Sequence, residues 1–114
     1  MIIHEAALRI RVSDRATSQA QLAHLLDHSE VDQITLRVIP FALDGFARAS
    51  STMIYACGSA PKLDTVVRDT PHGSVFLDSE AQLDACRTRF RRVADASLDP
   101  ARSRDLIREL SKEL

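Results

Sequence analysis

The side chains that could do chemistry in this 114-residue chain are few, and the densest group lies within one turn. Asp69, His72 and Ser74 bring an acid, an imidazole and a hydroxyl within six residues. A nucleophilic triad needs a base that contacts the hydroxyl and a third group that orients the base, usually drawn from separate elements. Because all three residues share one Pro-Gly turn, we expect the Asp and Ser side chains to bond to nearby backbone instead. We therefore predict no catalytic residue, and a small hydrolase that uses this turn or Cys57 is the least favoured hypothesis.

His24 and His28 have the four-residue spacing that can place two imidazoles on one metal ion. The metalloprotease form of this motif has Glu beside the first His, where this chain has Leu25. The sequence supplies no third ligand at a recognisable spacing, so we predict no metal site. The three glycines are isolated from one another, which argues against a phosphate-binding loop and leaves no cofactor predicted.

Four arginines lie within six residues, at positions Arg87, Arg89, Arg91 and Arg92. On a helix they would fan out over the side opposite Leu83, which is where a solvated helix face carries its charge. The chain holds only four Phe, one Tyr and no Trp, so it lacks a stacking platform for single-stranded nucleic acid. The net charge of -1 likewise provides no general attraction to nucleic acid or to anionic membrane.

Length and composition predict one ordinary globular domain over residues 1–114, with 45% hydrophobic and 27% charged residues. No apolar run approaches the roughly 18 to 20 residues that cross a bilayer, and no signal peptide is recognisable. Cys57 and Cys86 are too few for a disulfide scaffold, and we expect both to act as small apolar residues. These features predict a cytoplasmic location, with no membrane partner.

Strand-like and helix-like patterns alternate along the chain and predict an α+β fold. Strands are predicted over residues 34–41, 52–56, 63–68 and 74–77, with ladder pairing ending near Pro40 and a hairpin turn at residues 71–73. Residues 2–12 fit either a strand or a helix, and the alternation of Leu8, Ile10 and Val12 favours a strand. We thus expect a mixed or antiparallel sheet of about four or five strands.

Three helices carry start signals. Capping-box patterns begin at Ser18 and Ser79, and Asp99 with the following proline marks the start of a C-terminal helix. The predicted fold therefore has one helix near the N-terminus and two C-terminal helices. The helix after Ser79 has one apolar-to-small stripe, formed by Leu83, Cys86, Phe90, Val93 and Ser97.

Two connections carry apolar residues that a loop does not readily bury. They make candidate contacts for a partner, namely Phe41, Phe46, Tyr55 and Leu63. The alternative interpretation, that these four side chains cap the end of the sheet, stays equally open.

Six stretches in order resemble one family. They are Glu5-Ala6-Ala7-Leu8-Arg9, the leucine pattern of residues 21–26, the strand of residues 34–41, Leu63-Asp64-Thr65-Val66, residues 72–78 and Ser103-Arg104-Asp105-Leu106-Ile107. Together they resemble the uncharacterised C-terminal domain of actinobacterial helix-turn-helix regulators of the XRE class, which are described as antitoxin-like.

This resemblance implies a non-enzymatic regulatory domain that binds a partner protein or a small ligand and relays its occupancy to a DNA-binding domain. Met1 leads almost directly into the Glu5–Arg9 motif, so we expect that the DNA-binding half is missing and that DNA is contacted only through it. The resemblance also implies a small protein, encoded next to the regulator, as the partner. A dimerisation module, in which the terminal helices form a homodimer, is the alternative.

Overall fold

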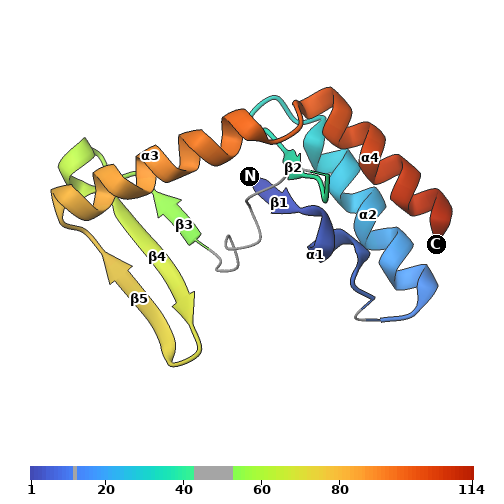
Figure 1. Ribbon diagram of the computed structural model, residues 1–114, viewed down its shortest axis with the longest axis horizontal. Helices are drawn as coiled ribbons and strands as arrows, with labels where there is room; N and C mark the ends of the chain where they lie inside the picture. Colours follow the sequence, from blue (N-terminus) through green and yellow to red (C-terminus); the bar gives the residue numbers. More distant parts are fainter. Residues whose placement is uncertain (12, 43–52) are drawn as a thin grey trace. The chain divides into compact units, whose positions relative to one another are not determined.

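The computed structural model describes residues 1–11, 13–42 and 53–114, and it divides into two compact units. The first unit comprises Met1–Asp44 and Val93–Leu114, and the second comprises Gly45–Arg92. Each unit is described by itself below. The predicted α+β class is confirmed, and the strands form two sheets, one of two strands and one of three (Figure 1).

The elements follow one another in a mixed order along the chain. They are β1 (Ile2–His4), α1 (Glu5–Arg9), α2 (Arg15–Ser29), β2 (Arg37–Ile39), β3 (Met53–Ala56), a 3₁₀ turn η1 (Pro61–Leu63), β4 (Thr65–Thr70), β5 (Gly73–Leu77), α3 (Glu80–Ala96) and α4 (Pro100–Glu113). Among the described residues, no helix combines the length and the apolar character needed to cross a membrane.

The start of the chain resolves the ambiguity of residues 2–12, because strand and helix both form there. β1 pairs in parallel with β2, with Ile3 opposite Val38. The helix α1 follows at once because the His4 Nδ1 accepts a hydrogen bond from the Ala6 N–H at 3.0 Å, which caps the helix N-terminus. Expecting one strand across this region was therefore wrong beyond His4. Of the residues 34–41 that were predicted to form a strand, Arg37–Ile39 form β2, and this strand ends before Pro40 as expected.

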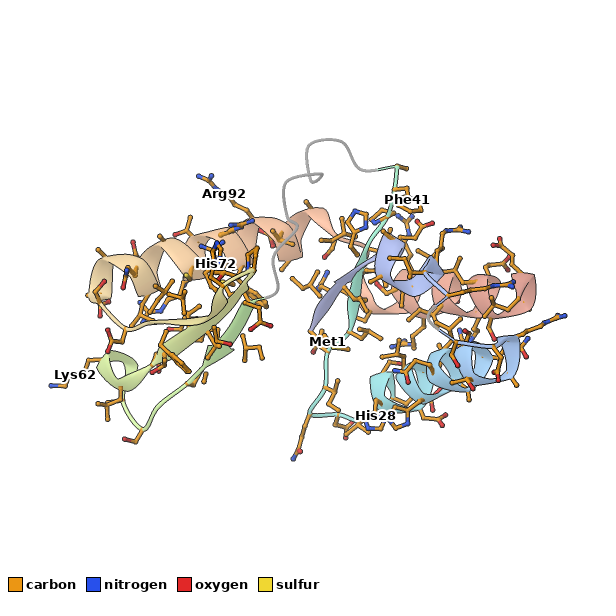
Figure 2. All side chains as sticks on the ribbon, turned by 90° about the horizontal axis from the view of Figure 1, so that it is seen from below. Met1, His28, Phe41, Lys62, His72 and Arg92 are labelled. Carbon is orange, nitrogen blue, oxygen red and sulfur yellow. The ribbon has the colours of Figure 1, made fainter. Side chains whose placement is uncertain are left out.

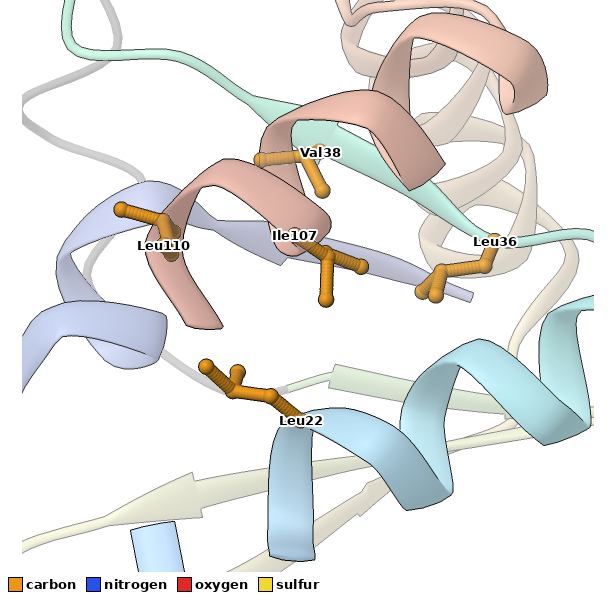
Figure 3. Close-up of a cluster of buried hydrophobic side chains, with 5 residues drawn as sticks. All are labelled: Leu22, Leu36, Val38, Ile107 and Leu110. Carbon is orange, nitrogen blue, oxygen red and sulfur yellow. The ribbon is translucent and has the colours of Figure 1, made fainter. Parts of the chain in front are cut away.

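The core of the first unit joins α2, α4, β2 and the residue just before β2. Five buried side chains fill it: Leu22, Leu36, Val38, Ile107 and Leu110 (Figure 3). The buried Ser103 ties α4 to the strand, because its Oγ accepts from the Val38 N–H at 2.9 Å and donates to the Leu98 carbonyl at 3.2 Å. The helix α2 begins one turn earlier than predicted. Its N-cap is Asp14, whose carboxylate accepts from the Thr17 N–H at 2.7 Å, and not Ser18.

The second unit is an antiparallel sheet in the order β3-β4-β5, covered on one face by α3. The predicted hairpin joins β4 to β5, and Gly73 adopts a φ of +118° at the turn, a conformation that favours glycine (Figure 1). The predicted capping box opens α3, where Ser79 and Gln82 exchange hydrogen bonds of 3.3 and 3.4 Å. The strand predicted from Leu63 starts at Thr65 because η1 occupies residues 61–63.

The second core is smaller. Val66, Leu83 and Cys86 are buried, and Met53, Tyr55 and Leu77 pack against them. The predicted stripe of α3 therefore holds at Leu83 and Cys86 but not at Phe90, whose side chain is exposed.

Candidate functional site

Among the described residues, the sheet of the second unit has one face buried under α3 and one face that is exposed. Successive residues of a strand point to opposite faces of the sheet. Two rows of cross-strand partners, one on each face, therefore run across the three strands. One row, Tyr55–Val66–Leu77, faces α3 and belongs to the core. The other row, Ile54–Val67–Phe76, points to the opposite side, and we call it the open row. Ile54 is 59% exposed and Phe76 is 69% exposed.

Polar residues border the open row. On the same face of β4 and β5, Asp69 lies opposite Ser74, and the Ser74 Oγ donates to Asp69 Oδ1 at 3.0 Å. Both residues are exposed. The open row is therefore an apolar strip with a hydrogen-bonded polar pair at the hairpin end of the sheet.

A polar cluster on the other face holds the connection between β3 and β4 against α3. We call it the Asp64 cluster: Tyr55, Gly58, Asp64 and Arg87. Asp64 Oδ1 accepts from the Gly58 N–H at 2.8 Å, and Oδ2 accepts from the Tyr55 hydroxyl at 2.5 Å. Arg87 donates to both partners, from Nε to the Tyr55 oxygen at 2.7 Å and from Nη2 to Asp64 at 3.5 Å.

These bonds perturb the titration of the Asp64 cluster. The hydroxyl of Tyr55, the Gly58 N–H and the nearby Arg87 lower the pKa of Asp64, against the effect of burial. Burial, followed by the bond to Asp64, raises the pKa of Tyr55. The bond to Tyr55 raises the pKa of Arg87, so the arginine stays charged. Asp64 and Arg87 thus form an ion pair at the β3–β4 connection, and Tyr55 acts as a neutral hydroxyl donor to Asp64.

Gly58 has a steric role in the Asp64 cluster. A Cβ atom at this position would lie 2.6 Å from both the Leu63 Cβ and the Leu63 carbonyl oxygen. The backbone of residue 58 can approach Leu63 this closely only without a side chain. The glycine therefore allows the connection to fold back so that the Gly58 N–H reaches Asp64.

The first unit contains a similar arrangement, which we call the Glu5 cluster: His4, Glu5, Arg9 and Phe41. The buried Glu5 accepts from the Phe41 N–H at 3.1 Å and from Arg9 Nε at 2.6 Å. The Arg9 guanidinium lies 5.8 Å from the centre of the Phe41 ring, and the His4 ring meets that ring edge-on at 5.6 Å. Figure 2 shows Phe41 just beyond β2.

Burial raises the pKa of Glu5, but the hydrogen bonds from Arg9 and the Phe41 amide outweigh it, so the net pKa is lowered. Arg9 also donates to Glu113 at 3.1 Å, which connects α1 to the end of α4. The contacts of Glu5 and Arg9 therefore connect α1 to the end of α4 and to the backbone of Phe41.

The first unit also carries an open groove of about 530 Å³ between α4 and the segment after α2. Acidic and basic side chains line it together: Glu30, Asp32, Arg104 and Arg108. Arg108 is paired with Asp105 at 3.1 Å on its own helix. Val31, Ile34 and Pro100 also line the groove, so it combines charged and apolar side chains.

Asp69, His72 and Ser74, which the sequence places in one turn, do not form a chain of contacts from acid to imidazole to hydroxyl. Ser74 bonds directly to Asp69, so the imidazole of His72 does not lie between the hydroxyl and the acid. The bonds between side chain and backbone in this turn are made by Thr70, whose hydroxyl accepts from the His72 N–H at 3.3 Å and donates to the Gly73 carbonyl at 2.7 Å. The sequence had led us to expect such bonds from Asp69 and Ser74, which bond to each other instead.

The His24 and His28 rings lie side by side, with centres 4.1 Å apart. The His28 Nδ1 contacts the His24 carbonyl oxygen at 3.1 Å. In the part of the chain that the structure describes, no group of three or more His, Cys, Asp or Glu residues is placed to hold a metal ion.

Two other expectations need correction. Arg87 is not a solvated residue of α3, because it is turned into the Asp64 cluster, whereas Arg89, Arg91 and Arg92 are exposed as predicted. Cys86 is buried as expected, but Cys57 is exposed and does not act as a small core residue.

The predicted partner contacts are divided. Phe41 is 56% exposed and Leu63 is 59% exposed, whereas Tyr55 is tied into the Asp64 cluster. Phe46 lies outside the described residues. The open row was not predicted as a contact surface. Its signal was present in the strand alternation and in the hairpin turn that places Phe76 opposite Val67, but the sequence did not reveal which face α3 covers.

Comparison with known proteins gives one family match. The model of a domain of unknown function, DUF5753, matches residues 1–109. Neither the curated proteins nor the solved structures contain a match to this chain.

Proposed function

Because the chain belongs to the DUF5753 family of uncharacterised domains, we propose that it is a non-enzymatic regulatory domain that binds a partner. The order of the motifs from Glu5–Arg9 onward supports its placement in a cytoplasmic helix-turn-helix regulator of the XRE class, from an actinobacterium. In that setting the domain binds a partner protein or a small ligand, and a DNA-binding domain fused before it responds. Such coupling requires that the partner bind two states of the regulator with different affinity.

The open row is the observation that carries this proposal. A large apolar side chain exposed alone is common on protein surfaces, but Ile54, Val67 and Phe76 are cross-strand neighbours and form a continuous strip. A contiguous apolar strip with polar residues at its border is a candidate surface for binding another protein. The partner-protein form of the proposal is therefore favoured over the small-ligand form, for which the groove at Arg104 is the candidate place.

Polar groups in the molecule support binding rather than catalysis. Among the described residues, every buried side-chain nitrogen or oxygen has a hydrogen-bond partner. The carboxylates with perturbed pKa, such as Glu5 and Asp64, bond to backbone amides and arginines that connect elements of the fold. These groups are occupied by structural contacts, and no reacting centre is needed to explain them.

Dimerisation is the second proposal, and the burial of part of the expected surface limits where the dimer interface could lie. The terminal helices were expected to present an apolar surface to a second copy, but Ile107 and Leu110 of α4 are buried in the core of the first unit. A homodimer through these helices would therefore have to use α3, where Phe90 is exposed. The sedimentation mass tests this: a value equal to the 12.6 kDa monomer at micromolar protein contradicts dimerisation.

A titration with the adjacently encoded small protein tests the main proposal. In a ¹⁵N-labelled sample, we expect the amide signals of β3, β4 and β5 to shift on addition of that protein. The Phe76→Ser variant should lose the shifts, and the matched Phe90→Ser variant, which changes an exposed Phe on α3, should keep them. Unchanged signals at excess partner would contradict the assignment of a partner-binding role to the open row.

A further inference from the structure

The two ends of the open row carry acidic side chains. Asp69 lies two residues after Val67 on β4, at the hairpin end of the sheet. Asp78 lies two residues after Phe76, and strand alternation continued past the end of β5 places it on the same face at the opposite end. Both residues are exposed. Among the described strand residues of this face, Asp69 is the only charged one, so with Asp78 the strip has one acidic group at each end.

The size of the face limits what it can bind. Three strands spaced about 4.8 Å apart and about five residues long present roughly 14 by 17 Å. This is about a third of the roughly 800 Å² that each partner buries in a standard protein interface. The face thus fits a short segment with a few anchoring side chains better than a broad surface.

A second copy of the same face is a poor occupant. Face-to-face packing of two open rows would bring Asp69 and Asp78 of both chains into one small interface. Like charges placed together oppose association, whereas basic side chains at these positions would favour it. Charge complementarity therefore selects a segment that carries the opposite charge at its ends.

We propose that the open row binds a short segment of a partner protein in which two or three apolar side chains are flanked by lysine or arginine. The apolar side chains contact Ile54, Val67 and Phe76, and the flanking cations lie near Asp69 and Asp78. This inference rests on the proposed partner-binding function and specifies the chemistry of the partner.

Two synthetic amphipathic peptides test this proposal on the full chain. One contains leucine and lysine, and the other has glutamate in place of every lysine. In a ¹⁵N titration, we expect the lysine peptide to shift the amides around Ile54, Val67 and Phe76, and the glutamate peptide to leave them unmoved. Added salt should lower the affinity for the lysine peptide, because salt screens the attraction between exposed charges.

Variants separate the charge from the apolar surface. The double variant Asp69→Asn with Asp78→Asn should reduce the affinity for the lysine peptide by about three- to tenfold. This is the combined effect expected for the loss of two exposed ion pairs. The control Asp84→Asn with Asp95→Asn changes the net charge equally, at exposed positions on α3, and should leave the affinity unchanged. Phe76→Ser should abolish the shifts.

The outcomes distinguish this inference from the proposed function. Equal binding of both peptides at the open row, unaffected by the Asp69 and Asp78 changes, overturns the basic segment but leaves a partner-binding surface in place. Shifts confined to the groove at Arg104, or no shifts in a folded chain, overturn the inference as well. If the adjacently encoded protein also leaves the open row unmoved, the proposed function fails with it.

Discussion

The Glu5 cluster and the Asp64 cluster are built on the same plan in the two units. In each, a carboxylate accepts a backbone N–H through one oxygen and contacts an arginine through the other. In each, that arginine lies near an aromatic ring, with Arg9 at 5.8 Å and Arg87 at 5.7 Å from the ring centre. Each arginine also reaches a second, more exposed acid.

The clusters differ in how far apart in the sequence their members lie. Glu5 and Arg9 are one helical turn apart, whereas Asp64 and Arg87 are separated by 23 positions. The surrounding cores also differ. Among the described residues, the core cluster of the first unit contains five buried apolar residues, and that of the second unit contains three. The second unit thus depends more on its polar cluster, and it leaves one sheet face open.

The largest difference should appear when each core loses a side chain. We expect Leu83→Ala to cost about 3 kcal/mol, because Leu83 is fully buried in the smaller core. Ile107→Ala is the matched change in the larger core. Hydrogen exchange should show lost protection mainly in β3–β5 for Leu83→Ala and mainly in α2 and α4 for Ile107→Ala. The same protection pattern for both variants would contradict the description of two separate cores.

The next effect should come from Gly58→Ala. The new Cβ would meet the Leu63 backbone at 2.6 Å, and relieving this contact would displace the Gly58 N–H from Asp64. We expect a loss of about 1 to 3 kcal/mol in unfolding free energy, measured by urea denaturation. The neighbouring Ser59→Ala, at an exposed position, should stay within about 0.5 kcal/mol of the original chain. Equal stability of the two variants would show that the connection can move away from Leu63 at little cost.

The separation between cluster members also explains what could be predicted from the sequence. The capping box at Ser79, the start of α4 at Asp99 and the hairpin before Gly73 depend on residues within one turn, and all three were predicted correctly. The position of Arg87 depends on Tyr55, 32 positions away. Arg87 was expected on the side of the helix opposite Leu83, but it follows Leu83 by four positions and so lies on the same side as Leu83. A helical pattern cannot identify Tyr55, on another element, as its partner.

The same limit applies to the strands and to the candidate site. Residues 2–12 contain both strand and helix signals because His4 ends β1 and caps α1. Parallel pairing between β1 and β2 joins segments more than thirty residues apart, and no local signal specifies it. Alternation predicts that Phe76 and Leu77 face opposite sides, but only the packing of α3 decides that Phe76 is the exposed one.

A smaller and pH-dependent effect should distinguish the two carboxylates. Both carboxyl groups have a lowered pKa in the folded chain. Each therefore stabilises the fold at a pH above its ordinary pKa, which is 4.5 for Glu5 and 3.8 for Asp64. This stabilisation is lost as the pH falls through the lower pKa of the folded state. Glu5→Gln and Asp64→Asn should each lower the melting temperature by a few degrees at neutral pH. In each variant the melting temperature should then fall less steeply as the pH is lowered.

The exposed Asp84→Asn serves as the control for these variants and should preserve the original acid dependence. Melting curves recorded from neutral pH down to below the ordinary value of Asp64 provide the measurement. If Asp64→Asn has the acid dependence of the unaltered chain, the Tyr55 and Arg87 contacts do not stabilise its charged form in solution.

The smallest expected effect is that of Phe76→Ser on stability. Phe76 is 69% exposed, whereas Val66, on the covered face of the adjacent strand, is fully buried. Replacing Phe76 should change the unfolding free energy by no more than about 0.5 kcal/mol, as for other exposed positions. Val66→Ser removes a core side chain and introduces a buried hydroxyl, so it should be strongly destabilising. Urea denaturation of both variants makes the comparison. A loss from Phe76→Ser as large as that from Val66→Ser would mean that the open row is covered in the isolated chain, and a partner could then reach it only by displacing that cover.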